Sequence, residues 1–175
     1  MSLRRLWAVW RMPYIKLLAS EGSKECIFCT LPAAKNDKEN LILYRTELCF
    51  IILNKYPYNP GHLMVAPYRH VASLDELSDE EAIDLWILVK LAMLTLRRAM
   101  SPEGFNVGAN IGKAAGAGFE GHVHVHIVPR WNGDTNFMPV ISNTKVVSDA
   151  LRNTYEELRE SLQEVLRDMG IRRPS

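Results

Sequence analysis

The sequence predicts an α+β domain in which an antiparallel sheet packs against two helices. Short β-type runs follow one another with turn residues between them, and two longer stretches carry apolar residues at helical spacing. The chain has 175 residues, of which 47% are hydrophobic and 23% are charged, as in an ordinary globular domain. We therefore expect one domain over residues 1–175, with an N-terminal segment (1–25) packed on it and a frayed tail (170–175).

Composition excludes several classes of protein. A formal net charge of +1 leaves no basic excess for nucleic acid. The longest apolar stretch, Ala82 to Ala99, is too short and too charged to cross a bilayer. Three cysteines do not make a disulfide framework, and no secretory segment is recognisable. We expect a cytoplasmic protein with neither a nucleic-acid nor a membrane partner.

The first half of the predicted sheet has three strands. Leu41 to Arg45 and Leu48 to Asn54 are β-type runs separated by two residues, which indicates a hairpin. Lys55 to Gly61 contains two prolines and a glycine and is expected to form a loop. His62 to Pro67 is the third strand.

A long helix is expected next. Ser78 is a good N-cap residue, and Glu81 three positions later completes a capping box. The helix is expected to end at about Met100, before Pro102. Its helical spacing predicts one apolar face, with Trp86 in the core. That face comprises Ile83, Trp86, Ile87, Lys90, Leu91 and Leu94.

The second half of the chain supplies two more strands and the second helix. Gly104 to Ile111 is a strand, Gly112 to Gly121 is a loop of small residues, and His122 to Pro129 is the last strand. Roughly Val146 to Met169 forms an amphipathic helix. Its apolar side comprises Leu151, Tyr155, Leu158, Leu162 and Val165.

The last strand carries His122, His124 and His126 on alternate positions, although the chain has only five histidines. Alternate side chains of a strand share a face, so the imidazoles point one way and Val123 and Val125 the other. Three explanations fit: a merely exposed polar face, a metal centre that uses the imidazoles as ligands, and nucleophilic attack on phosphorus. The preceding glycine-rich loop offers backbone N–H groups to anionic oxygens, which favours the third.

The run HVHVHIV (His122 to Val128) resembles the signature of the histidine triad (HIT) superfamily. LNKYPYNPGHLMVAP (Leu53 to Pro67) resembles the family's N…PGH strand-loop-strand segment. Two further segments, LWAVWRMPYI near the start and PRWNGDTNF (Pro129 to Phe137), resemble its Fhit-like branch, in particular the bacterial diadenosine tetraphosphate phosphorylase-like members. The resemblance extends from about Leu6 to Leu166 and implies the HIT-like fold and a homodimer.

The resemblance also implies an activity and a set of roles. His124 would attack the α-phosphorus of an adenine nucleotide and form a nucleotidyl-histidine, and His126 would bind the phosphate and assist the leaving group. The other implied substrate-binding positions are Asn54 at the ribose, His62 beside the triad, and Asn110, Gly116 and Gly118 at the phosphate loop. The implied function is a hydrolase or transferase acting on dinucleoside polyphosphates. Alternatives are a phosphorylase using inorganic phosphate, an adenosine phosphoramidase and a non-catalytic nucleotide-binding protein.

Two departures from the family pattern bear on which molecule accepts the nucleotidyl group in the second step. HIT proteins commonly carry Gln and then Ser or Thr where this chain has Ala117 and Gly118, which leaves only backbone donors at that point. The segment between Asn110 and His122 is also one residue longer than in typical hydrolases of the family. Water and inorganic phosphate both remain open as the second acceptor.

The resemblance implies a zinc site as well, formed by Cys26, Cys29, His70 and His122. Two thiolates three positions apart and two imidazoles would make a closed tetrahedral site with no open position for chemistry. We therefore expect structural zinc and no organic cofactor. The alternative is a pair of reduced, packed cysteines with an idle His70.

Overall fold

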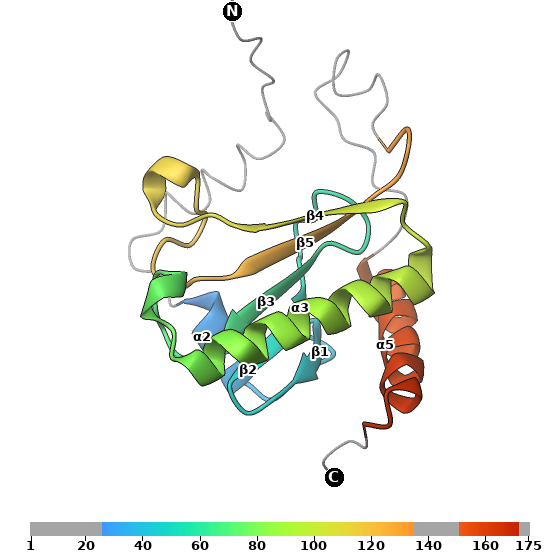
Figure 1. The fold of residues 1–175 in the computed structure, drawn as a ribbon, viewed down its shortest axis with the longest axis horizontal. Coiled ribbons are helices and arrows are strands. Elements are labelled where there is room, and N and C mark those ends of the chain that lie inside the picture. The colour runs from blue at the N-terminus through green and yellow to red at the C-terminus, as the bar shows by residue number, and fades with distance from the viewer. Residues whose placement is uncertain (1–25, 135–150, 172–175) are drawn as a thin grey trace, which may run out of the picture.

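The computed structural model describes residues 26–134 and 151–171, shown in colour in Figure 1. Expectations for residues 1–25, for 135–150 and for the last four residues lie outside this part of the chain. Within it, three α-helices and one five-stranded antiparallel sheet are present, which confirms the α+β class.

The predicted strands and helices are present with similar bounds, except that β5 begins three residues later than predicted. The strands are β1 (Ile42–Arg45), β2 (Cys49–Leu53), β3 (Leu63–Pro67), β4 (Gly104–Ala109) and β5 (Val125–Arg130). The helices are α2 (Ile27–Ala33), α3 (Asp79–Met100) and α5 (Leu151–Asp168). The strand order is β1-β2-β3-β5-β4, so the histidine-bearing strand lies inside the sheet and β4 lies at its edge.

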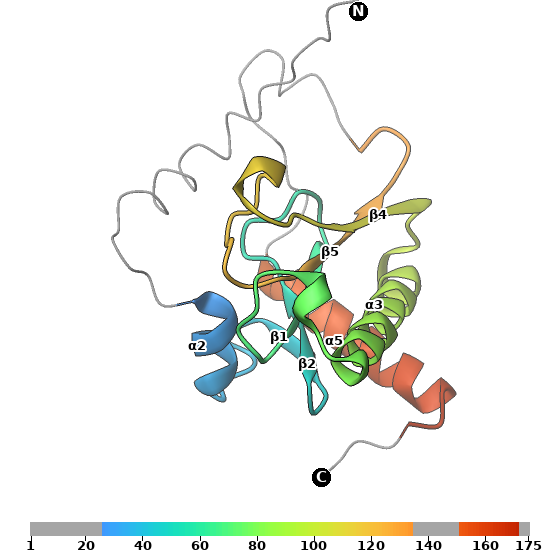
Figure 2. The same cartoon turned by 60° about the vertical axis from the view of Figure 1, so that its left-hand side comes forward.

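The two faces of the sheet contact different helices. Cys49, Ile51 and Leu53 of β2 belong to the main core with α3 and α5. Phe50 and Ile52, on the alternate positions, belong to a second cluster with α2. Figure 2 shows α2 on the opposite side of the sheet from α3. Strand periodicity therefore assigns each side chain either to the main core or to the α2 face.

The start of α3 has the predicted capping box. The Ser78 hydroxyl accepts from the Glu81 N–H at 3.2 Å, and a Glu81 carboxylate oxygen accepts from the Ser78 N–H at 2.9 Å. The same carboxylate pairs with the Arg69 guanidinium at 2.6 Å. Chiefly because of Arg69, the pKa of Glu81 falls to about 2. This ion pair attaches the loop after β3 to the helix.

The predicted buried face of α3 was wrong for four of its six residues, of which Lys90 is exposed as a charged side chain. Ile83, Trp86 and Ile87 are 61%, 54% and 54% exposed. The helix instead buries a neighbouring row against the sheet and α5, comprising Leu85, Leu88, Val89, Leu91, Ala92 and Leu96. Both rows are apolar at helical spacing, so periodicity alone could not decide which of them meets the sheet.

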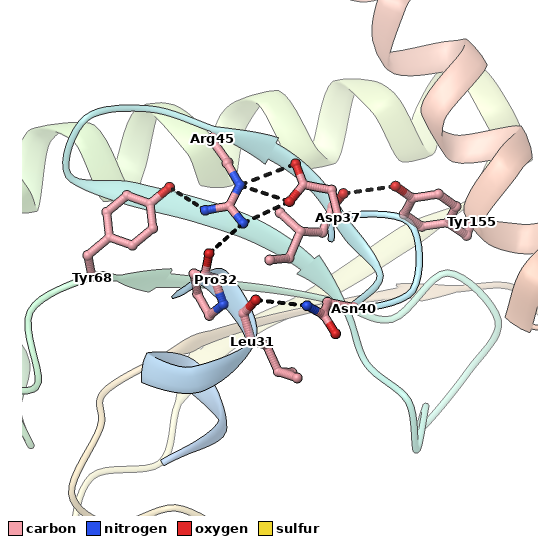
Figure 3. A network of polar contacts seen from close by, with 8 residues as sticks. Leu31, Pro32, Asp37, Asn40, Arg45, Tyr68 and Tyr155 are labelled. Atoms are coloured by element: carbon pink, nitrogen blue, oxygen red, sulfur yellow. Dashed lines mark hydrogen bonds and ion pairs between the residues drawn. The ribbon is translucent and has the colours of Figure 1, made fainter. Parts of the chain in front are cut away.

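Helix α2 was not predicted. Its seven residues include Pro32, and they are too few for an apolar period to be recognised. At its C-terminal end Asn40 Nδ2 donates to the Leu31 carbonyl at 2.9 Å, and Arg45 Nη2 donates to the Pro32 carbonyl at 3.0 Å. Figure 3 shows Arg45 reaching this helix end and Asp37 at once. The helix is thereby anchored to the sheet.

Helix α5 buries the predicted side against α3 and β1, including Tyr155, Leu158, Leu162 and Val165. The Tyr155 hydroxyl donates to the Ile42 carbonyl at 3.0 Å, as Figure 3 shows. Among the described residues, no helix has the length and hydropathy of a membrane span.

Candidate active site and metal centre

The three alternate histidines lie on the α2 face of the sheet. Strand β5 begins only at Val125, so His122 and His124 precede it, in contrast to the predicted strand start. The alternation nevertheless holds, because Val125 and Ile127 pack in the main core beneath α3. The imidazoles face α2, whose presence makes His122 and His124 almost fully buried.

All five histidines of the chain gather in this region. The His70 and His122 rings have centroids 5.2 Å apart, those of His124 and His126 4.8 Å, and those of His126 and His62 5.1 Å. Imidazoles gain or lose a proton near neutral pH, and clusters of such side chains are typical of functional sites.

Backbone contacts determine the tautomer of His124. Its Nδ1 lies 2.9 Å from the His122 carbonyl oxygen, which can only accept a hydrogen bond. Nδ1 therefore carries the proton, and Nε2 is the unprotonated nitrogen of the neutral ring. Burial lowers the pKa of His124, so the neutral form prevails at neutral pH. A nucleophilic imidazole needs this state.

A second chain of hydrogen bonds orients His126. The backbone N–H of Tyr58 donates to His62 Nδ1 at 3.1 Å, so the proton of neutral His62 lies on Nε2. His62 Nε2 is 3.0 Å from His126 Nδ1, to which it donates. Neutral His126 then carries its proton on Nε2. Adjacent histidines thus offer different groups, an unprotonated nitrogen on His124 and a donor on His126.

A cavity of about 560 Å³ opens beside these two rings. Its volume is within the range of small-molecule sites. Of the predicted substrate-binding residues, Asn54, Asn110, Gly118 and His126 line it. The apolar part of the lining includes Ile27, Phe28, Leu31, Leu41, Ile52 and Phe119.

Two predicted substrate-binding residues, His62 and Gly116, do not line the cavity, and Asn54 connects the lining with His62. His62 is fully buried and supports His126. Asn54 Oδ1 accepts from the Tyr56 N–H at 2.9 Å, and its Nδ2 lies 3.3 Å from His62 Nδ1. Gly116 has φ +82° at the end of a short 3-10 turn, a conformation that favours glycine. In this structure its contribution is to the shape of the loop.

The predicted metal ligands also meet. The potential ligand atoms of Cys26, Cys29, His70 and His122 all lie within 4.8 Å of one another. Three sulfur–nitrogen separations are 3.3, 3.4 and 3.6 Å. Tetrahedral zinc with ordinary bond lengths places a sulfur and a nitrogen ligand about 3.5 Å apart. The group could therefore hold a metal ion.

His122 has the second hydrogen bond that a metal ligand requires. Its Nε2 donates to the Pro67 carbonyl at 2.9 Å, which leaves Nδ1 unprotonated and directed at the two cysteine sulfurs. A fixed tautomer of this kind orients the ring toward a cation. Four protein ligands would complete the coordination, so the site has the character of a structural centre.

Comparison with known proteins agrees with this geometry. The model of the HIT domain matches residues 35–133, which is more than half of the chain. The chain belongs to the HIT domain family. An AP-4-A phosphorylase of Mycobacterium tuberculosis is 42% identical over 87% of this chain and 81% of its own length. A bis(5'-adenosyl)-triphosphatase of Dictyostelium discoideum is 31% identical over 73% of this chain and 85% of its own length.

The fold of this HIT protein also resembles a solved structure. A hypothetical histidine triad nucleotide-binding protein from Sulfolobus tokodaii superposes with a TM-score of 0.70 at 28% identity. The match covers 86% of this chain and all of the other. This likeness confirms the predicted HIT-like fold.

The loop before the triad offers this HIT protein backbone donors at the cavity. The N–H groups of Ala115, Gly116 and Ala117 bond to carbonyls inside the turn. Within the described residues, those of Gly118 and Phe119 donate to no backbone carbonyl, and both residues line the cavity. Donors at this position suit the oxygens of a phosphate group.

Sequence reasoning missed three residues of the site. Phe28 stacks on His124, Tyr58 lies against His62 and His126, and Asn59 is a buried residue of the loop between β2 and β3. Asn59 Nδ2 donates to the Pro129 carbonyl at 3.0 Å and to Asp134 Oδ2 at 2.8 Å. Only the position of Phe28 between two cysteines could have drawn attention to it.

Proposed function

We propose that this HIT protein cleaves dinucleoside polyphosphates through a nucleotidyl-histidine formed on His124. One observation carries the proposal: a buried neutral imidazole whose Nδ1 proton is bound by a backbone carbonyl lines a cavity of nucleotide-compatible size. The names of the relatives, a phosphorylase and a triphosphatase of diadenosine polyphosphates, support the choice of substrate.

In the first step, His124 Nε2 attacks the α-phosphorus. A phosphorus–nitrogen bond forms while the bond to the bridging oxygen of the leaving polyphosphate breaks. His126 Nε2–H hydrogen-bonds to that oxygen and offsets its growing charge. In the second step, an acceptor oxygen attacks the same phosphorus, the phosphorus–nitrogen bond breaks, and His124 is regenerated.

The cavity provides for the rest of the nucleotide. Ile27, Leu31 and Ile52 form an apolar wall suited to the faces of a purine base. Asn54 lies at the same cavity, in the position proposed for ribose. The N–H groups of Gly118 and Phe119 are the proposed donors to the α-phosphate oxygens.

A second candidate function is phosphorolysis, in which inorganic phosphate is the acceptor. It is favoured by the AP-4-A phosphorylase that is 42% identical over most of both chains. Product analysis after incubation with diadenosine tetraphosphate, with and without inorganic phosphate, separates the two reactions. Hydrolysis gives ATP and AMP, whereas phosphorolysis gives ATP and ADP only when phosphate is present. Binding of the nucleotide without any product would contradict the proposed cleavage.

The proposed occupant of the cysteine–histidine group is structural zinc. Two thiolates and two imidazoles are a donor set that zinc prefers, and the separations of their atoms fit it. Bound zinc would link α2 to His70 and His122. It would not activate the substrate, because no coordination position remains for it. His122 would then belong to the support of the site, while His124 and His126 perform the reaction.

The proposed assembly is a homodimer that covers the exposed apolar row of α3. Ile83, Trp86 and Ile87 are more than half exposed, and β4 is an edge strand whose Val107 is 38% exposed. Figure 2 shows α3 and β4 on the same side of the molecule. An exposed apolar row on the same side of the molecule as an open strand edge is typical of a protein–protein interface.

Trp86→Glu is expected to convert the dimer into a monomer, because a carboxylate would have to be buried in an apolar contact. Size-exclusion chromatography with light scattering at micromolar concentration measures this. Arg167→Glu, a charge change at an exposed position of α5, is the control and should leave the dimer intact. A monomeric wild-type protein, or a dimeric Trp86→Glu protein, would contradict the proposed interface.

A further inference from the structure

Phe28 connects the metal-binding group with the triad. It lies between Cys26 and Cys29 in the sequence, and only 1% of its surface is exposed. Its ring stacks on His124 with centroids 4.5 Å apart and an interplanar angle of 28°. The same ring lies 5.3 Å from the ring of His122. One aromatic side chain therefore touches both a metal-binding imidazole and the proposed nucleophile.

The orientation of the His124 ring depends on its stacking contact with Phe28. The torsion that turns an imidazole has broad minima, so one hydrogen bond at Nδ1 leaves the ring free to tilt. Phe28 covers one face of the ring, and the edge-on ring of His126 lies 4.8 Å away. Together these neighbours define the direction in which Nε2 points. In-line attack on phosphorus is sensitive to that direction.

The position of Phe28 depends in turn on both ends of α2. Asn40 and Arg45 hold the C-terminal end, as Figure 3 shows for Leu31 and Pro32. At the other end, Cys26 and Cys29 meet His70 and His122. A helix of seven residues has little stability of its own, so these anchors determine where its side chains lie.

We propose that Phe28 is a positioning residue that couples occupancy of the cysteine–histidine metal group to the orientation of His124. The proposal rests on the proposed function, since it takes His124 as the nucleophile. Phe28 also lines the cavity and can contact the base. Its two roles differ in their kinetic consequence. Loss of a wall contact weakens nucleotide binding, whereas loss of positioning slows adduct formation at saturating nucleotide.

The kinetic test compares Phe28→Leu, Phe28→Tyr and Leu31→Ala with the wild type in single turnovers of diadenosine tetraphosphate. Phe28→Leu should slow adduct formation at saturation roughly 10- to 100-fold, because the nucleophile is misaligned. Phe28→Tyr keeps the ring and should restore the rate to within about threefold of wild type. Leu31→Ala removes a wall contact on the same helix and should raise KM while largely retaining that rate.

A second readout needs no turnover. Ring C–H correlation spectra of the five histidines report on the environment of each imidazole. Stripping the metal from the wild type should shift or broaden the His124 signals along with those of the ligand histidines. Phe28→Leu with metal bound should produce a similar change at His124, and stripping metal from this variant should add little to it.

The outcomes separate the two proposals. A wild-type protein that forms no adduct overturns the proposed function, and the spectra still decide the coupling. A Phe28→Leu protein with an adduct rate within threefold of wild type at saturation overturns the positioning role. His124 signals that do not respond to metal removal, while the His70 and His122 signals do, overturn the coupling to the metal.

Discussion

His124→Asn is expected to lower the rate of dinucleoside polyphosphate cleavage roughly 10⁴-fold or more, which corresponds to about 5.5 kcal/mol of barrier. The amide has no unprotonated ring nitrogen with which to attack phosphorus. Its NH₂ group can still donate to the His122 carbonyl that His124 Nδ1 now contacts. The fold should therefore survive, with a melting temperature within a few degrees of wild type.

Single-turnover kinetics and a thermal melt on the same preparation measure this pair of effects. AMP binding should persist in the variant, because the apolar wall and the backbone donors of the cavity are unchanged. His126→Asn is the matched comparison, since it removes the ring Nε2–H proposed to contact the leaving oxygen but keeps the nucleophile, and it should still accumulate some adduct. A loss of less than tenfold in His124→Asn would rule out the nucleophile assignment.

Cys26→Ser is expected to remove zinc from the protein and to lower its stability. A serine hydroxyl is not ionised at neutral pH and is a poor substitute for a thiolate ligand. Loss of one of four ligands frees the N-terminal end of α2 from His70 and His122. We expect a loss of roughly 3 kcal/mol, or a fall of about 6–12 °C in melting temperature.

Elemental analysis after gel filtration measures the zinc content, and calorimetry measures the melting temperature. Cys49→Ser is the matched control, because Cys49 is fully buried in the main core and lies outside the metal-binding group. That variant should keep its zinc. Unchanged zinc content in Cys26→Ser would show that the four residues are not the metal ligands.

Local patterns in the sequence predicted most of the fold. The capping box at Ser78 and Glu81 is present, and the hairpin of β1 and β2 has the predicted order. Such features depend on neighbours a few positions apart. The exposure of Trp86 could not be predicted, because both apolar rows of α3 satisfy the helical period and only tertiary packing selects one.

The candidate site was predictable in its residues but not in its chemistry. The alternation of histidines and the resemblance to the HIT family identified the triad, and the resemblance supplied His70 as a distant candidate ligand. The protonation pattern depends on the carbonyls of Pro67 and His122 and on the N–H of Tyr58. Contacts with backbone groups cannot be inferred from the residue types in the sequence. The stacking of Phe28 on His124 cannot be inferred from them either.

The most direct test of the account is mass spectrometry of the protein during turnover of diadenosine tetraphosphate. Quenching must avoid acid, because a phosphorus–nitrogen bond on histidine is acid-labile. If His124 is the nucleophile, we expect a transient adduct of one AMP that maps to His124 and disappears as products form. Turnover without an adduct at any time point, or an adduct on another residue, would show that His124 is not the nucleophile.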